Sequence, residues 1–406
     1  MRFDTLAVHA GAYPFTIGGA HPTAPPLVLA SGYWYDSVDE LDRVLGDEQP
    51  GYSYARYASP SVVGFEAAVA ALEGAPAAVA FASGMAAIHA AIRSCAPTPG
   101  SVLFASQDCY GGTFTLLNNT LTQEGVKVRL VDVFDVPGLA RRMADERPAA
   151  LLLEVVSNPL ERVADIDAIV VLGQANGVPI LVDSTFTTPY LIKPLSKGAT
   201  TVIHSATKYL GGHGDVTGGV VACSTEEQAA GLRNWRKYTG AVLGVMEAYL
   251  SLRGVRTLSL RMARQCGNAA AVAQTLSGDR RIERVYYPGL ADSCDYSVAC
   301  RLFPEGLFGA MLAFAIRDAD KAGVMRFLER LQLIRAAPTM GDCFSLVLYP
   351  VIASHRGLSP AQRRERGIHD NVVRFSAGIE DPAAVGVRAR VAPPARAAEP
   401  DRSGPG

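Results

Sequence analysis

The sequence predicts an α/β fold with a central, mostly parallel sheet that carries helices on both faces, and a smaller α+β C-terminal domain. Short apolar runs without polar alternation recur at Ala78–Phe81, Ala149–Val156 and Val178–Val182, and such runs are typical of strands buried on both faces. Stretches with helical periodicity lie between them, which favours parallel strands joined by helical crossovers. From about Arg256 the composition changes, which indicates a second unit.

The other helices and strands are predicted from the spacing of apolar residues along the chain. Helices are predicted where apolar residues recur near the 3.6 period, and each ends where a glycine suits a C-cap. Short apolar runs predict further strands. The expected helices are 62–73, one opening at Ser83, and 165–176 before Gly177; the expected strands are 102–105, 201–204, 312–316 and 344–348.

Four segments divide the chain. Residues 1–58 are rich in Gly, Pro and aromatic residues and have little to bury alone, so we expect an N-terminal arm that contacts a neighbouring subunit. Residues 59–255 should form the α/β domain and residues 256–390 the C-terminal α+β domain, entered through an amphipathic helix at Arg256–Thr275. The tail, 391–406, is rich in Pro, Ala and Arg and is expected to be disordered.

The composition excludes several functional classes. The 406 residues carry a net charge of −1, which argues against nucleic-acid or anionic-membrane partners. Seven cysteines are scattered without a C-x-x-C pair, as expected for reduced thiols. We find no secretory signal or membrane span, and the histidines lie too far apart to predict a metal site. These features predict a cytoplasmic enzyme.

The chemistry is concentrated between Asp183 and Gly219. Asp183 directly follows a predicted strand, and Ser205, Thr207 and Lys208 follow the next one, before a glycine-rich loop. The carboxyl ends of parallel strands are where open α/β sheets bind ligands. Two hydroxyls, a lysine and flexible glycines can together bind a phosphate and present a reactive amine.

This set meets the requirements of pyridoxal 5'-phosphate (PLP), which needs an amine for a Schiff base, a carboxylate against its ring nitrogen and donors for its phosphate. Lys208 can be the amine, Asp183 the carboxylate, and Ser205 and Thr207 the donors. Taken singly, Lys208 is more simply a solvated surface charge and Asp183 a helix N-cap. Their spacing favours a cofactor site.

The segment HSATKYLGGHGDVTGG, residues 204–219, resembles the cofactor-lysine segment of the Cys/Met-metabolism family of PLP enzymes. This family contains cystathionine γ-synthases, cystathionine γ- and β-lyases, methionine γ-lyases and O-acyl-homoserine sulfhydrylases. The resemblance runs from about Thr5 to Asp381. It implies the aspartate-aminotransferase-like fold type I, PLP as cofactor, and a homo-oligomer, expected to be a dimer of dimers.

Within the arm, YSYARYASPS (residues 52–61) is similar to the family motif Tyr-x-Arg-x-x-Asn-Pro-Thr, with Ser59 and Ser61 in place of Asn and Thr. The resemblance assigns Tyr54 and Arg56 to the phosphate of the partner subunit's cofactor. A guanidinium suits a phosphate as a bidentate donor that stays charged. On local sequence alone, an arginine paired with a surface acid is the simpler interpretation.

Four further residues in the α/β domain match the family. Gly84 and Met85 open a helix after a strand, where free N–H groups and the helix dipole favour an anion, and the resemblance places them at the PLP phosphate. It assigns Tyr110 to stacking on the cofactor face, where its hydroxyl can move protons; a core tyrosine is the alternative. Asn158 is implied beside the cofactor's 3′-oxygen and the substrate.

Two positions in the C-terminal domain complete the expected site. Arg374 matches the family arginine that holds the substrate α-carboxylate, and an arginine flanked by apolar residues is costly to bury unless an anion meets it. Thr339, in Thr-Met-Gly-Asp, matches the first residue of the family's Ser-Leu-Gly. The resemblance places it near the cofactor-linked lysine and the substrate carboxylate.

Together these residues predict γ-elimination or γ-replacement on a γ-substituted L-amino acid of the homoserine, methionine or cystathionine type. Lys208 would move the α-proton, and Tyr110 with the neighbour's Tyr54 would assist the leaving group. The sequence departs from the family at Pro338, where cystathionine-type γ-enzymes have glutamate, and at Gly112, where methionine γ-lyases have cysteine. These departures, with that at Val351-Ile352, favour an unusual substrate in specialised metabolism.

Other activities stay open. The γ-replacing alternatives are a cystathionine γ-synthase and an O-acyl-homoserine sulfhydrylase. A β-lyase is less favoured, because Met340 stands where β-lyases often have an aromatic residue. A transaminase could use the same lysine and acid. A non-catalytic binding protein on a PLP fold is disfavoured by the intact set of Asp183, Lys208, Tyr110 and Arg374.

Overall fold

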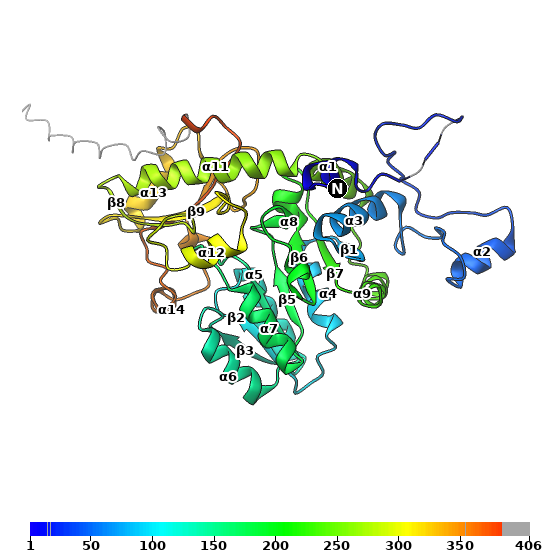
Figure 1. Ribbon diagram of the computed structural model, residues 1–406, viewed down its shortest axis with the longest axis horizontal. Coiled ribbons are helices and arrows are strands. Elements are labelled where there is room, and N and C mark those ends of the chain that lie inside the picture. Colours follow the sequence, from blue (N-terminus) through cyan, green and yellow to red (C-terminus); the bar gives the residue numbers. More distant parts are fainter. Residues whose placement is uncertain (14, 17, 354, 384–406) are drawn as a thin grey trace, which may run out of the picture.

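The computed structural model describes residues 1–13, 15–16, 18–353 and 355–383. Two β-sheets form the body, and a 20-residue helix, α11 (Leu258–Ser277), runs across both of them (Figure 1). The tail predicted to be disordered, 391–406, lies outside the described residues.

The central sheet has seven strands in the order β1-β7-β6-β5-β4-β2-β3. Strand β7 runs antiparallel to both of its neighbours, and the other neighbouring pairs are parallel. The predicted, mostly parallel sheet is therefore confirmed. The strands are β1 (Ala77–Phe81), β2 (Val102–Ser106), β3 (Lys127–Val131), β4 (Ala150–Glu154), β5 (Ile180–Asp183), β6 (Thr201–Ser205) and β7 (Gly219–Cys223).

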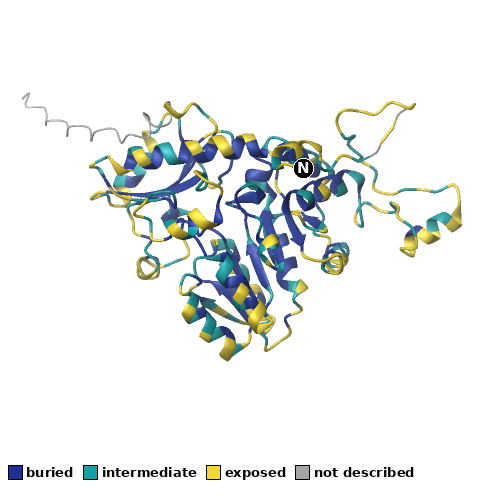
Figure 2. Cartoon of the chain, in the orientation of Figure 1, coloured by how far each residue is buried: buried dark blue, intermediate teal, exposed yellow. Residues whose placement is uncertain are grey.

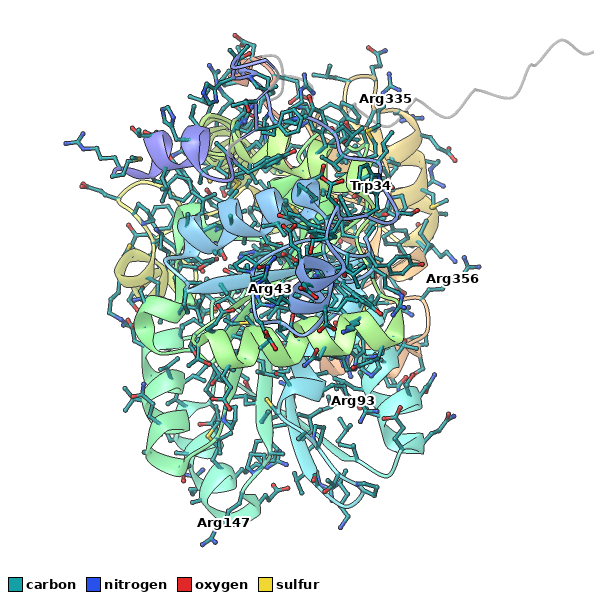
Figure 3. All side chains as sticks on the ribbon, turned by 90° about the vertical axis from the view of Figure 1, so that its right-hand side faces the viewer. Trp34, Arg43, Arg93, Arg147, Arg335 and Arg356 are labelled. Atoms are coloured by element: carbon teal, nitrogen blue, oxygen red, sulfur yellow. The ribbon has the colours of Figure 1, made fainter. Side chains whose placement is uncertain are left out.

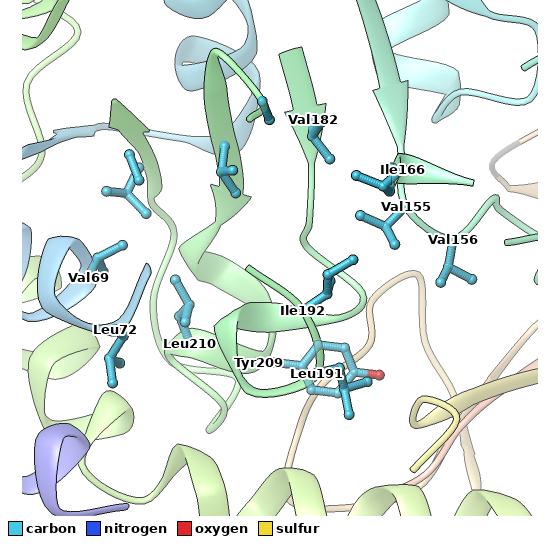
Figure 4. Close-up of a cluster of buried hydrophobic side chains, with 14 of the residues drawn as sticks. Val69, Leu72, Val155, Val156, Ile166, Val182, Leu191, Ile192, Tyr209 and Leu210 are labelled. Carbon is cyan, nitrogen blue, oxygen red and sulfur yellow. The ribbon is translucent and has the colours of Figure 1, made fainter. Parts of the chain in front are cut away.

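Alternate residues of each buried strand enter separate apolar clusters on the two faces of this sheet. In β5, Ile180 and Val182 join one cluster and Leu181 joins the other, which explains why the run has no polar alternation. Figure 4 shows part of the first cluster, around Val182 and Tyr209. The first face is covered by α3 (Pro60–Glu73), α6 (Val136–Glu146), α7 (Ile166–Asn176) and α10 (Val245–Val255), and the second by α4 (Gly84–Ser94), α5 (Gly111–Thr115), η1 (Leu116–Leu121) and α9 (Glu226–Thr239).

Four predicted helix ends agree with the structure, whereas α3 begins at Pro60 instead of residue 62 and α11 lies two residues later than the predicted Arg256–Thr275. Gly74 and Gly177 close α3 and α7 in the left-handed conformation, with φ of 72° and 64°, which glycine adopts without a Cβ penalty. Ser83 and Asp165 cap the N-termini of α4 and α7 through their side chains. The sheet and its helices thus fix the edge at which β4, β5 and β6 end.

The second sheet has five strands in the order β10-β11-β12-β9-β8, and only its β10–β11 pair is parallel. The first half of α11 packs in the central-sheet cluster through Leu258 and Met262, and its second half packs on the second sheet through Val272 and Leu276. The further elements are β8 (Ile282–Tyr286), α12 (Tyr296–Leu302), β9 (Met311–Ile316), α13 (Lys321–Glu329), β10 (Arg335–Ala336), β11 (Leu346–Leu348), η4 (Pro350–Ile352), α14 (Pro360–Glu365) and β12 (Val372–Ser376).

The arm has two short helices. Helix α1 (Phe3–His9) buries Ala7 and packs on α3 and α11 of its own chain. Helix α2 (Val38–Leu45) stands away from the body in an exposed stretch (Figures 1 and 2). Trp34, in front of the body in Figure 3, is 83% exposed. An arm with such exposed apolar groups is consistent with the expected contact to a neighbouring subunit, which stays a prediction.

Three further helices are short. α8 (Thr188–Leu191) and η2 (Pro194–Lys197) lie between β5 and β6, and η3 (Ala206–Leu210) directly follows β6. No helix among the described residues has the length and apolar character required to cross a bilayer.

Candidate active site

A cavity of about 480 Å³ lies where β4, β5 and β6 end. Residues of the second sheet and of the loops between its strands complete the wall of this cavity. It brings together almost every residue that the sequence predicts for the site. The predicted residues that line it are Gly84, Met85, Tyr110, Asn158, Asp183, Ser205, Thr207, Lys208, Thr339 and Arg374.

Lys208 lies in η3, directly after β6. Its neighbour Tyr209 is fully buried in the central core (Figure 4), which anchors the turn. Lys208 Nζ donates to Thr339 Oγ1 at 3.0 Å. Burial, with the positive charge of Arg374, lowers the pKa of Lys208 from 10.5 to about 8. The neutral amine, which is the nucleophilic and basic form, therefore dominates above about pH 8.

The first turn of α4 meets the end of β6. A Cβ added to Gly84 would lie 2.8 Å from Ser205 Cβ, so only glycine permits this close approach. The N–H groups of a helix's first turn have no partner within the helix. Gly218 N donates to Thr207 Oγ1 at 3.0 Å, which fixes that hydroxyl beside the turn.

Two carboxyl groups end neighbouring strands. Glu154 on β4 and Asp183 on β5 are register partners, and both line the cavity. Asp183 Oδ1 accepts from Thr185 N at 2.9 Å. Burial raises the pKa of both carboxyls, and the Asp183 charge raises that of Glu154 further. A positively charged group placed against Asp183 would stabilise its ionised form.

Tyr110 lies at the start of α5, and its backbone N donates to Glu154 Oε1 at 2.6 Å. Gly112 leaves room for the tyrosine ring: a Cβ at this position would lie 2.5 Å from the ring and 3.1 Å from Met85 Sδ. The ring therefore has its present place beside the cavity because position 112 carries no side chain.

Arg374 is buried on β12. Its guanidinium donates to Asn158 Oδ1 at 3.2 Å and to the Thr339 carbonyl at 3.1 Å. Burial lowers the pKa of Arg374, and the charge of nearby Glu161 opposes this shift. Both acceptors are neutral oxygens, so a substrate carboxylate would meet a cation without a direct acidic partner among the described residues.

The predicted arm residues do not line the cavity of their own chain. Arg56 lies with its guanidinium 5.3 Å from the ring centre of Tyr54 and 5.0 Å from that of Tyr57, and it donates to the Lys237 carbonyl. The part assigned to them in a neighbouring subunit stays a prediction.

Sequence reasoning did not assign a site role to several lining residues. Glu154 and Thr185 could have been found: Glu154 is the only polar residue inside the predicted run 149–156, and Thr185 follows the predicted run 178–182. The apolar wall comes mainly from loops, where no local signal marks a site. The unassigned lining residues are Ser83, Ile88, Glu154, Val156, Thr185, Phe186, Thr217, Leu348 and Ala353, and Pro338 and Met340, which the sequence analysis weighed for substrate choice, line the cavity as well. Among the described residues, no group of three or more His, Cys, Asp or Glu side chains could hold a metal ion.

The family model for the Cys/Met metabolism PLP-dependent enzymes matches residues 4–385. The chain belongs to this family. It is 37% identical over 382 residues to L-methionine gamma-lyase of Pseudomonas putida, with 93% of this chain and 94% of the relative covered. It is also 37% identical over 329 residues to cystathionine beta-lyase of Lactococcus lactis, with 81% and 85% covered.

A crystal structure of cystathionine gamma synthase from Xanthomonas oryzae, in complex with aminoacrylate and cysteine, superposes with a TM-score of 0.89. That protein is 32% identical, and the match covers 96% of this chain and 97% of that one. The predicted family, fold class and PLP cofactor are thereby confirmed, and the chain is a PLP-dependent lyase or synthase of Cys/Met-type metabolism.

The donor set of the cavity fits PLP. The Gly84–Ser205 approach leaves backbone N–H groups and two hydroxyls at one end, as a phosphate requires. A buried carboxyl at Asp183 suits a protonated ring nitrogen, and an amine of lowered pKa at Lys208 suits a Schiff base.

Proposed function

We propose that this chain catalyses γ-elimination or γ-replacement on a γ-substituted L-amino acid of the homoserine, methionine or cystathionine type. The main supporting observation is that one cavity is lined by the amine of Lys208, the buried carboxyl of Asp183 and the buried guanidinium of Arg374. We also propose that it works in the cytoplasm, and that its departures from the family pattern mark an unusual substrate.

The cofactor, when bound, withdraws electrons from the carbon atoms of the amino acid as protons leave them. In this proposal Ser205, Thr207 and the first N–H groups of α4, at Gly84 and Met85, hold its phosphate. Asp183 holds its ring nitrogen. The Tyr110 ring covers one face and excludes water from it.

The residues around the substrate have separate tasks. Arg374 and Asn158 hold and orient the α-carboxylate, which aims the Cα–H bond at Lys208. Lys208 Nζ, as a neutral amine oriented by the Thr339 hydroxyl, takes the α-proton. The Tyr110 hydroxyl, with the neighbour's Tyr54, gives a proton to the departing γ-substituent.

Part of the cavity wall is apolar. Pro338, Met340 and Leu348 line the cavity, and such a wall favours a substrate with an uncharged γ-substituent, of the methionine or O-acetyl-homoserine type. A β-lyase is the second candidate, because one relative at 37% identity bears that name. Met340 argues against a β-lyase, because β-lyases often have an aromatic residue at this position. Cystathionine γ-synthase and O-acyl-homoserine sulfhydrylase activities are the replacement forms of the same proposal.

The purified holoenzyme should be incubated with O-acetyl- and O-succinyl-homoserine, cystathionine, methionine and halogenated analogues, with and without an added thiol. We expect a four-carbon 2-oxoacid or a new thioether from at least one of them. Release of pyruvate from cystathionine would instead establish a β-lyase. Pyridoxamine phosphate formation with a 2-oxoacid would establish a transaminase, and no turnover of any amino acid would favour a binding protein.

We propose further that Tyr54 and Arg56 complete the cavity of a neighbouring subunit, so that a dimer is the smallest active unit and a dimer of dimers the expected assembly. Their position outside their own cavity and the exposed arm support this proposal. In a mixed dimer of Arg56→Ala and Lys208→Ala chains, one of the two sites would combine an intact Lys208 with an intact Arg56.

Each variant should therefore be nearly inactive alone, and co-expression of the two should restore part of the turnover. The measurement is 2-oxoacid release by the isolated mixed dimers. An absence of recovery in mixed dimers that retain PLP, or an active monomer, would refute the shared site.

A further inference from the structure

Glu154 is a carboxyl group on the cavity floor that the proposed reaction does not use. It ends β4, and its register partner on β5 is Asp183. Neighbouring strands lie roughly 4.8 Å apart, and register partners point to the same face of a sheet. Both residues accordingly line the same cavity. Two such carboxyls in a desolvated site share protons, and one of them stays neutral over a wide pH range.

Glu154 also holds the residue assigned to the cofactor face. Its Oε1 accepts from Tyr110 N at 2.6 Å, a bond that joins β4 to the loop after β2. Tyr110 is followed by Gly111 and Gly112, which restrict the backbone least of all residues. The Tyr110 carbonyl accepts from Phe114 N at 2.9 Å in the first turn of α5, and the bond from the Tyr110 N–H to Glu154 ties this turn to the sheet.

We propose that Glu154 is a positioning residue that acts as a neutral acid: its carbonyl oxygen fixes the Tyr110 backbone, while the negative charge of the pair stays on Asp183. The inference rests on the proposed roles of Tyr110 and Asp183. It adds a residue that touches neither the reacting carbon atoms nor the lysine, and that governs how the ring and the acid are presented.

The surroundings decide which carboxyl carries the proton. Asp183 accepts from Thr185 N, and the hydrogen bonds of Thr185 oppose the effect of burial on the Asp183 pKa. For Glu154, burial raises the pKa, and the charges of Asp183 on β5 and Asp108 after β2 raise it further. Only the Tyr110 N–H acts in the opposite direction. The proton is thus best placed on Glu154.

The test compares Glu154→Gln with Glu154→Ala as purified holoenzymes. Glutamine keeps an acceptor oxygen without a charge, whereas alanine removes the acceptor. We expect Glu154→Ala to change the visible circular dichroism of the bound cofactor and to lower kcat about tenfold, because one buried hydrogen bond is lost and the ring is displaced. Glu154→Gln should restore both readouts to within about twofold of the parent.

A double-mutant cycle with Tyr110→Ala separates positioning from general destabilisation. If Glu154 acts through Tyr110, the loss caused by Glu154→Ala should largely disappear in the Tyr110→Ala background. Thermal unfolding and cofactor content are measured for each variant. Fully additive losses in folded, loaded variants would overturn the positioning role.

Two further results would overturn the proposal. A Glu154→Gln variant as impaired as Glu154→Ala would mean that the site needs an ionised carboxylate. An unchanged spectrum and kcat in Glu154→Ala would mean that Tyr110 needs no anchor. Failure of the proposed function would look different, since the parent holoenzyme would then lack γ-cleavage while the spectral differences between variants persisted.

Discussion

Replacing Lys208 by alanine should remove the visible absorbance of the lysine-linked cofactor and lower turnover by at least about 10³-fold. The amine at this position has two tasks in the proposal: it tethers PLP and it moves the α-proton. Its pKa of about 8 reflects burial beside Arg374, and we find no second lysine among the described lining residues to replace it. The measurements are the absorbance spectrum and the rate of 2-oxoacid release.

Lys127→Ala is a suitable control, because Lys127 is an exposed residue on the edge strand β3. This variant should keep the spectrum and the turnover of the parent. Full activity in Lys208→Ala would contradict the assignment of the cofactor lysine, and with it the proposed mechanism.

Asp183→Asn should lower kcat/KM by about 10² to 10⁴-fold and weaken PLP binding. A neutral amide cannot keep the ring nitrogen protonated, so the carbanion charge has a poorer sink. Removal of one partner of a buried charge pair costs about 3–5 kcal/mol, which is the basis of this magnitude. The measurements are steady-state kinetics and the dissociation constant of PLP from the apo-protein.

Two controls accompany this substitution. Asp183→Glu retains the charge and should recover part of the activity, whereas Asp132→Asn alters an exposed acid away from the cavity and should have little effect. Parent-like kinetics in Asp183→Asn would show that another group holds the ring nitrogen, and would also weaken the charge assignment made for Glu154.

Much of the sheet could be predicted from the sequence because its strands are short apolar runs that stop at polar residues. The predicted runs around β4, β5 and β6 differ from the observed strands by one or two residues at most ends, and β5 ends at Asp183 as expected. The place of β7 could not be predicted. Its insertion, antiparallel, between β1 and β6 depends on packing between distant segments, and Gly219–Cys223 carries no local sign of its partners.

The site divides in the same way. Asp183, Ser205 and Lys208 could be placed from strand ends alone. The contacts of Lys208 with Thr339 and of Arg374 with Asn158 join residues 131 and 216 positions apart, so only the family resemblance suggested that they meet. Glu154 is the only polar residue in the predicted run 149–156, but it was not assigned a role, because PLP needs one carboxylate against its ring nitrogen and Asp183 already supplies it.

Position 112 carries glycine, where methionine γ-lyases have cysteine, and this difference has a consequence for inhibitor chemistry. No cysteine is among the described residues that line the cavity, Cys109 is buried, and the exposed thiols are Cys294 and Cys300. Electrophilic inhibitors that react with thiols would therefore modify cysteines on the surface of this enzyme and leave the cavity unmodified. A covalent inhibitor would instead have to capture the amine of Lys208 or one of the nearby hydroxyls.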